Sequence, residues 1–289
     1  MNKITCLILI LGIVSCQKEE TDGIPAYVKI DKITVVDTTI NNSTTDTSTY
    51  RNITDAWVSI NGINKGVHEL PANFPVLDNG NFQIRIYAGI KDNGIAAKRV
   101  SYPFYYSWDS SIKLTPDSTT IINPEVYIKE NISGQFDDFD NSYSFNSDSC
   151  CFQKESNGPY GNYGSLTLSD SILSTEVSYK DHPLNFGYDN NDVPQQGSPT
   201  YLELDYKNNT RFLVGVYINF PNSPTIERDL LWVSPQEDWN KIYINLTKVV
   251  TEEALGAINF SVFIKMQRNF DSEVNELQFD NIRIIHYKN

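Results

Sequence analysis

The residue pair best suited to chemistry is Glu203 and Asp205, two carboxylates separated by one residue. Residues i and i+2 of a β-strand point to the same side, so these acids would project together. Two carboxylates held side by side are the groups that a glycosidase uses as acid and base or nucleophile. The alternative is a solvated strand face with Leu204 and Tyr206 turned inward, and this is the interpretation we prefer.

Histidine and cysteine offer little catalytic chemistry. His68, His182 and His286 lie far apart without a shared motif, and neither CxxC nor HExxH occurs. Cys150 and Cys151 are adjacent, so a bond between them would require a distorted turn. Two thiols, one or both partly buried, are favoured over a vicinal disulfide. The sequence therefore predicts a protein that is not an enzyme.

Loop tyrosines could form a platform on which sugar rings stack. Tyr160 and Tyr163 lie in the glycine-rich segment 158–164, and Tyr188 lies in the polar loop 181–199. Exposed aromatic side chains in loops often mark binding sites, so these three are the candidate ligand-binding residues. Three tryptophans within alternating segments are expected in the core instead: Trp57, Trp232 and Trp239.

One short segment holds the densest aromatic run in the chain: Tyr102, Phe104, Tyr105, Tyr106 and Trp108. Aromatic residues are enriched at protein interfaces. The run predicts either packing between two domains or an interface with a partner protein, and the sequence leaves both open.

Short segments with a period of two predict the fold class. Aromatic residues make up 12% of the chain and favour β-structure. Only residues 247–256 suggest a helical turn. We expect an all-β protein of two antiparallel β-sandwiches, residues 24–130 and 131–289. The expected strands cover residues 27–36, 53–60, 82–90, 101–108, 119–129, 201–207, 211–218, 238–246, 258–266 and 276–287.

Charge is concentrated in the second half. The chain carries a net charge of −13, of which −11 falls on residues 131–289. This sign argues against nucleic acid as a partner. An acidic domain could hold a hard cation through oxygen ligands.

The N-terminus resembles a bacterial lipoprotein signal. Residues 1–15 are mostly apolar but too short to span a bilayer as a helix, and Ile13-Val14-Ser15-Cys16 is similar to the lipobox. The resemblance implies cleavage before Cys16 and acylation of that cysteine. Residues 16–23 resemble the polar tether of Bacteroidetes surface lipoproteins. We therefore expect an outer-membrane protein displayed on the cell surface, with the lipid as its membrane attachment.

The first domain resembles the PEGA-type surface-layer module, an Ig-like β-sandwich. The residues that carry the resemblance are the hairpin Val58-Ser59-Ile60-Asn61-Gly62, then Gly66, Leu70-Pro71 and Gly80. Asn-Gly is a strong signal for a tight hairpin, since both residues tolerate positive φ.

The second domain resembles the jelly rolls of carbohydrate-binding modules, which are galactose-binding-like folds. The resemblance is carried by residues 136–139, 238–246 and 277–284. It implies a structural Ca²⁺ between the first and last strands, and the matching positions are Asp138, Asp140 and Asp280. Laminarinase-like jelly-roll glycosidases carry a further glutamate beyond their acid pair, and Tyr206 and Lys207 stand there instead.

Three short motifs resemble the O-glycosylation acceptor of Bacteroidetes envelope proteins. Their acceptor residues would be Thr38, Ser118 and Ser171. If they are modified, these residues must lie on the surface.

Two functions of different class follow. The first is a non-catalytic accessory subunit of an outer-membrane β-barrel complex for protein assembly, export or uptake, which the aromatic run and the tether motivate. The alternative is a surface lipoprotein that binds glycans through its jelly-roll loops.

Overall fold

The computed structural model describes residues 23–36, 52–140, 144–147 and 151–289. These residues form strands, apart from one short helical turn, η1, Val249–Glu253. The all-β fold class is therefore confirmed. Cys16 and Thr38 lie outside the described residues, as does Cys150. In the described part of the chain, no helix is long and apolar enough to cross a membrane.

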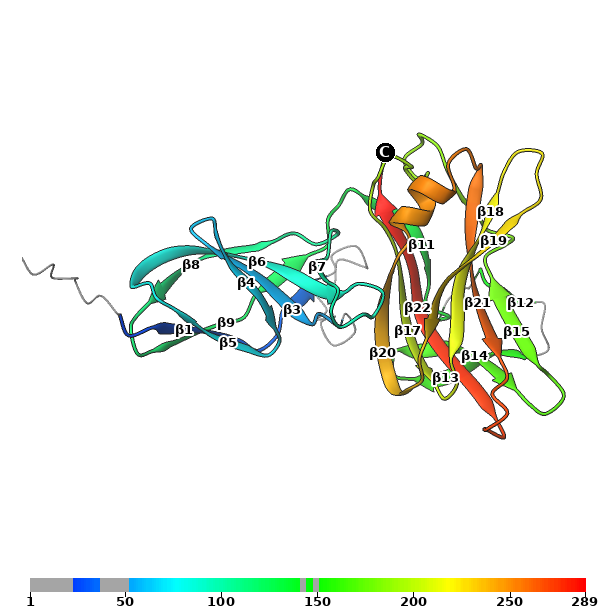
Figure 1. The fold of residues 1–289 in the computed structure, drawn as a ribbon, viewed down its shortest axis with the longest axis horizontal. Coiled ribbons are helices and arrows are strands. Elements are labelled where there is room, and N and C mark those ends of the chain that lie inside the picture. Colours follow the sequence, from blue (N-terminus) through cyan, green and yellow to red (C-terminus); the bar gives the residue numbers. More distant parts are fainter. Residues whose placement is uncertain (1–22, 37–51, 141–143, 148–150) are drawn as a thin grey trace, which may run out of the picture.

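The strands fall into two groups, which Figure 1 shows as two bodies. The N-terminal sandwich consists of β1 (Ala26–Ile30), β2 (Thr34–Val36), β3 (Asp55–Ile60), β4 (Ile63–Glu69), β5 (Ala72–Val76), β6 (Gly80–Lys91), β7 (Arg99–Ser101), β8 (Trp108–Leu114), β9 (Thr119–Ile122) and β10 (Glu125–Tyr127).

The C-terminal sandwich consists of β11 (Ile132–Asp137), β12 (Asn146–Ser147), β13 (Phe152–Gly158), β14 (Gly161–Leu168), β15 (Ser174–Ser178), β16 (Leu184–Asn185), β17 (Thr200–Asn208), β18 (Phe212–Asn219), β19 (Ile226–Val233), β20 (Gln236–Asn245), β21 (Asn259–Gln267) and β22 (Asn275–Tyr287). Apart from one isolated bridge, Asp92 to Tyr243, strands pair only within their own sandwich.

Alternation of apolar and polar residues builds the N-terminal sandwich. Strands β3, β4, β6, β7 and β8 form one sheet, and β5, β1 and β9 form another. Asn61 and Gly62 close the β3–β4 hairpin with φ of 47° and 77°, as the Asn-Gly signal predicts. The expected antiparallel arrangement is incomplete, because β1 pairs with β9 and β2 with β10 in parallel.

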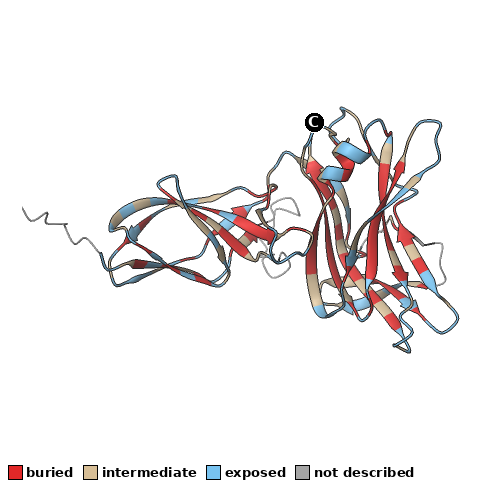
Figure 2. Cartoon of the chain, viewed as in Figure 1, coloured by how far each residue is buried: buried red, intermediate tan, exposed pale blue. Residues whose placement is uncertain are grey.

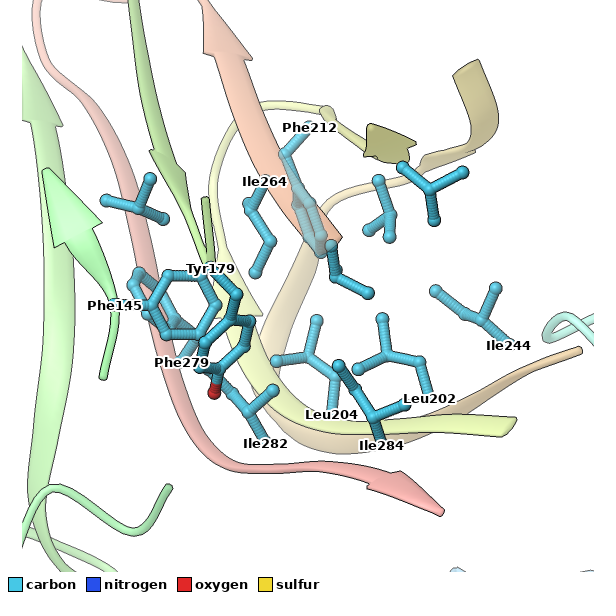
Figure 3. Close-up of a cluster of buried hydrophobic side chains, with 14 of the residues drawn as sticks. Phe145, Tyr179, Leu202, Leu204, Phe212, Ile244, Ile264, Phe279, Ile282 and Ile284 are labelled. Carbon is cyan, nitrogen blue, oxygen red and sulfur yellow. The ribbon is translucent and has the colours of Figure 1, made fainter. Parts of the chain in front are cut away.

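Two sheets enclose the core of the C-terminal sandwich. We call β13-β14-β22-β17-β20, with β11 on β22, the facing sheet, because it lies toward the N-terminal sandwich in Figure 1. The far sheet is β12-β15-β21-β18-β19, with β16 on β21. Between them pack apolar side chains such as Phe279, Leu204, Phe212 and Ile264, shown in Figure 3. Burial of this apolar surface is the main force that holds the two sheets together.

Buried residues alternate along strands such as β5 and β6 (Figure 2), as the period of two predicts. Strands β17 and β18 of the C-terminal sandwich are instead buried on both faces. The strands expected at 201–207, 211–218, 238–246, 258–266 and 276–287 are all present, each within two residues. The strand expected at 101–108 is wrong, because only Ser101 and Trp108 are in strands. Residues 102–107 leave the sheet, and Tyr102, Phe104 and Tyr105 pack against the C-terminal sandwich instead.

Candidate functional site

The outer face of the facing sheet carries the side chains that could do chemistry. Strand β17 turns Leu202 and Leu204 into the core, so Glu203 and Asp205 point to the opposite, outer face. On the next strand, β20, Lys241 lies opposite Asp205. The N-terminal sandwich covers one end of this face and leaves the other end open.

At the covered end, two carboxylates and a lysine are buried together. Tyr102 donates a hydrogen bond of 2.6 Å to Glu203 Oε1. Lys241 Nζ lies 2.9 Å from Asp205 Oδ1 and 3.8 Å from Glu203 Oε2. Asn281 Nδ2 also donates to Asp205, at 2.9 Å. The buried charges are thus paired and hydrogen-bonded, which is the condition for keeping them out of water.

The expectation of a solvated face for Glu203 and Asp205 is therefore wrong. These residues are 1% and 2% exposed, because the N-terminal sandwich lies over them. Burial raises the pKa of Asp205, while the Lys241 ammonium opposes that rise. Burial also raises the pKa of Tyr102 well above its usual value, so it stays a neutral donor. A substrate cannot reach a carboxylate pair sealed in this way.

Most of the aromatic run belongs to the same covered end. Tyr102, Phe104 and Tyr105 are buried, and Tyr102 contacts Tyr243 of the C-terminal sandwich at 4.8 Å and Tyr201 at 5.5 Å between ring centroids. A partner protein cannot meet buried rings, so the partner-interface prediction is wrong for these three residues. They pack the two sandwiches together instead.

The remaining two residues of the run are not buried in that contact. Tyr106 is exposed, and Trp108 is half-buried where β8 begins. The structure therefore leaves a partner interface untested at these two positions only.

At the open end, three rings meet. Tyr160 lies in the turn between β13 and β14, and Tyr163 lies in β14. Their ring centroids are 6.0 and 5.7 Å from that of Trp239 on β20. All three rings are partly exposed. We call Tyr160, Tyr163 and Trp239 the aromatic patch.

The contact spans the facing sheet. Strands β14 and β20 are separated by β22 and β17, which places them about 14 Å apart at a strand spacing of about 4.8 Å. The Tyr163 and Trp239 rings nevertheless approach to 5.7 Å. The two side chains therefore lean toward each other across the two strands between them.

Glycines shape the loop that carries the two tyrosines. A Cβ at Gly158 would lie 2.7 Å from the Tyr163 ring, and one at Gly161 would lie 2.4 Å from Asp140 Oδ1. Gly161 also has φ of +126°, which other residues rarely adopt. Asp140 Oδ1 accepts a hydrogen bond from the Asn162 backbone at 2.8 Å and so ties this loop to the start of the sandwich.

Tyr188 does not join the patch. It is 89% exposed in its own loop, and no ring contact connects it to Tyr160 or Tyr163 among the described residues. Trp239 takes the third position, although it was expected in the core. Trp57 and Trp232 are likewise not buried, so the core prediction is wrong for all three tryptophans.

The prediction of a Ca²⁺ site at Asp138, Asp140 and Asp280 stays a prediction. No group of three His, Cys, Asp or Glu residues within the described residues is arranged to hold a metal ion. Asp138, Asp140 and Asp280 accept hydrogen bonds from nearby backbone N–H groups, at 3.1, 2.8 and 2.7 Å. Burial, together with the charges of Asp205, Asp140 and Asp138, raises the pKa of Asp280 to about 8.

Two of the predicted O-glycosylation sites, Ser118 and Ser171, are described by the structure and lie on the surface. Ser118 and Ser171 are both exposed, and Ser118 Oγ donates to the Thr115 carbonyl at 2.7 Å. Their modification stays a prediction. Cys151 is buried in the core of the C-terminal sandwich.

No protein-family model and no curated protein sequence matches this chain. Among solved structures, the xylan-binding domain of carbohydrate-binding module family 22 is 12% identical with a TM-score of 0.37, over 55% of this chain and 97% of that one. The family 11 module from Clostridium thermocellum, in complex with a β-1,3-1,4-mixed-linked tetrasaccharide, is 13% identical with a TM-score of 0.35, over 53% and 94%. A family 29 module is 8% identical with a TM-score of 0.34, over 53% and 87%. Similarity at this level carries no inference about a ligand.

Proposed function

We propose that this chain is a non-catalytic glycan-binding protein and that the aromatic patch is its sugar platform. The observation that carries the proposal is the meeting of Tyr160, Tyr163 and Trp239, three partly exposed rings, over the outer face of the facing sheet. A pyranose ring has an apolar C–H face that packs against an aromatic face. Tyrosine and tryptophan also present a polar edge that can bond to sugar hydroxyls.

Polar side chains accompany the rings on the same face. Lys207 of β17 pairs with Gln278 of β22, and Gln278 pairs with Ser165 of β14. Because Lys207 and Gln278 lie beside Trp239 and Tyr163, a ligand over the rings would meet an ammonium and a carboxamide, while Ser165 is buried beneath them. These groups can donate to or accept from sugar hydroxyls.

Catalysis is not part of the proposal. The paired acids suggested by the sequence, Glu203 and Asp205, share the cation of Lys241 and are covered by the N-terminal sandwich. Glycan binding is also favoured over the accessory-subunit hypothesis. The aromatic run motivated a barrel partner, but Tyr102, Phe104 and Tyr105 of this run are buried between the two sandwiches.

The proposed setting is the cell surface, with Cys16 acylated as the N-terminal sequence predicts. A mature polypeptide that begins at Cys16 and carries acyl groups in intact-mass analysis supports this part. A different N-terminus would remove the membrane anchor from the proposal but not the sugar site.

Calorimetric titration of the full chain with cellohexaose, xylohexaose, laminarihexaose and mannohexaose tests the function. For an oligosaccharide that binds, we expect Tyr163→Ala and Trp239→Ala each to weaken affinity at least about tenfold, as the loss of a stacking contact of about 1.4 kcal/mol would. Tyr188→Ala is the matched control, because it removes an exposed tyrosine outside the patch. Unchanged affinity in both patch variants, or no binding by any probe, contradicts the proposal.

A further inference from the structure

A cleft of about 480 Å³ opens where the two sandwiches meet. Its C-terminal wall comes from the end of β19 and from β20, the edge strands of the far and facing sheets. Its N-terminal wall comes from Asn52, Thr54 and the β6–β7 connection. The volume falls within the range of about 300–1,000 Å³ that is usual for small-molecule sites.

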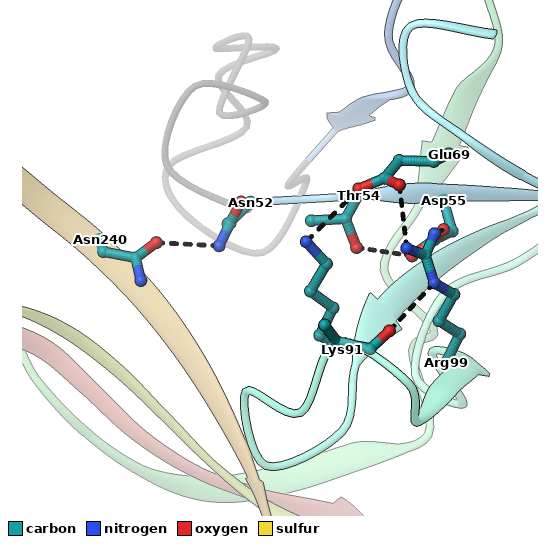
Figure 4. Close-up of polar contacts among 8 residues, drawn as sticks. Asn52, Thr54, Asp55, Glu69, Lys91, Arg99 and Asn240 are labelled. Atoms are coloured by element: carbon teal, nitrogen blue, oxygen red, sulfur yellow. Dashed lines mark hydrogen bonds and ion pairs between the residues drawn. The ribbon is translucent and has the colours of Figure 1, made fainter. Parts of the chain in front are cut away.

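Carboxamides dominate the polar lining of the cleft, with Asn52 from the N-terminal sandwich and Gln236 and Asn240 from the C-terminal one. Asn52 Nδ2 donates to Asn240 Oδ1 at 3.0 Å (Figure 4). It also donates to the Lys241 carbonyl at 2.9 Å, so these bonds join the two sandwiches. A carboxamide both donates and accepts. A lining of this kind fits a ligand whose groups also do both, and hydroxyls are such groups.

Trp232 is the exposed aromatic residue of the cleft and lies among apolar lining residues such as Ile95 and Ile242. Trp232 is 38% exposed and lines the cleft wall. The Arg211 guanidinium lies 4.7 Å over the ring and fixes its orientation. An anchored, accessible aromatic ring next to carboxamides is suited to a ligand with one apolar face and a hydroxyl-bearing rim.

The charge of the lining points to an uncharged ligand. No aspartate or glutamate is among the described residues that line the cleft, although the chain has 36 acidic residues. Its two lysines are already compensated. Lys91 Nζ lies 3.5 Å from Glu69 Oε1, and Lys241 is bound to Asp205. A bound carboxylate would therefore have to compete for these cations.

We propose that this cleft is a second saccharide site, distinct from the aromatic patch, which takes a neutral sugar unit between the two sandwiches. Trp232 stacks on the sugar ring, and the amides of Asn52, Gln236 and Asn240 bond to its hydroxyls. Because both sandwiches contribute, bound sugar also ties them together. The site stands on its own contacts and does not rest on the patch being a sugar site.

Hydroxyl-radical footprinting with mass spectrometry locates binding on the full chain. The probes are the same four neutral hexasaccharides, with hexagalacturonate as the charged comparison. We expect a neutral hexasaccharide to reduce labelling of Trp232, and hexagalacturonate to leave it unchanged. In calorimetry, Trp232→Ala should weaken one class of site at least tenfold, and Gln236→Ala, which removes an exposed amide without a core contact, should weaken the same class.

Tyr163→Ala and Tyr188→Ala serve as controls and should leave Trp232 protection intact. Protection confined to Tyr163 and Trp239, with affinity unaffected by Trp232→Ala and Gln236→Ala, overturns the cleft proposal and leaves the patch standing. Protection of Trp232 by hexagalacturonate alone overturns the neutral class of ligand. Loss of Trp239 protection in Tyr163→Ala, with Trp232 still protected, supports the cleft and separates it from the patch.

Discussion

The two outer faces of the C-terminal sandwich carry the same arrangement in different surroundings. On the facing sheet, Lys241 lies between Glu203 and Asp205, and its side chain is 4% exposed. On the far sheet, Lys265 lies between two glutamates and is 23% exposed, with Nζ 2.6 Å from Glu227 Oε1. The residue types are alike, and the difference is that the N-terminal sandwich covers only the first cluster.

Coverage changes what these ion pairs contribute. The second carboxylate of the far cluster, Glu176, lies 3.4 Å from Lys265 Nζ and also accepts from Tyr217 at 2.7 Å. Water can replace a lost partner there, so each pair contributes little. At the facing cluster, water cannot enter, and a charge without its partner would remain desolvated. The same cluster therefore becomes essential only where a second domain seals it.

The largest effect expected is from Lys241→Met. The substitution keeps a similar side-chain volume but leaves Glu203 and Asp205 buried without a cation. We expect the C-terminal sandwich to lose about 3–5 kcal/mol of unfolding free energy, measured by urea denaturation. A loss of unfolding free energy below about 1 kcal/mol would show that water reaches Glu203 and Asp205 despite the N-terminal sandwich.

The next effect is a pH dependence caused by Asp280. Its folded pKa of about 8 lies above the unfolded value of about 4, so between these values the folded protein keeps a proton that the unfolded chain has lost. Stability should therefore fall as pH rises from 4 to 8, by up to about 1.4 kcal/mol per pH unit.

Asp280→Asn should remove this slope. The unfolding free energies of the wild type and the variant are measured between pH 5 and pH 8, and one is subtracted from the other. The subtraction cancels the contributions of His68 and His286, which also titrate differently in the folded protein because burial lowers their pKa values. A difference that stays constant with pH would contradict the assignment.

A smaller loss is expected from Tyr102→Phe, which removes the hydroxyl that donates to Glu203 across the two sandwiches. An acceptor that loses its donor in a buried site costs about 1–3 kcal/mol. Tyr106→Phe, at an exposed tyrosine four residues away, is the control and should change thermal stability very little. Equal melting temperatures for both variants would mean that the hydroxyl of Tyr102 does not hold the interface.

The smallest effect is expected from Lys265→Met, the far-sheet counterpart of Lys241→Met. Because this cluster is in contact with water, the loss should stay below about 1 kcal/mol in the same urea experiment. Sensitivity to salt sharpens the comparison, since an exposed pair is screened and a sealed pair is not. A loss equal to that of Lys241→Met would mean that coverage does not distinguish the two faces.

Much of the fold could be read from alternation, and the reasons for the failures are physical. Strands such as β17 and β22 were predicted because apolar residues alternate along them, and successive side chains of any strand point to opposite faces. The exposed position of Trp239 was not predicted, because alternation shows only that a residue lies on one side of a sheet. Which side faces water depends on where another domain lies.

The residue order by itself determined the all-β class, the Asn61-Gly62 hairpin and the pairing of Glu203 with Asp205 on one strand face, because each depends on neighbouring residues and backbone geometry. Only the tertiary structure decided that these acids are sealed, that Tyr102 binds one of them, and that Tyr163 and Trp239 meet. Burial and contact between distant segments depend on how two sandwiches dock, and no local pattern in the chain encodes that.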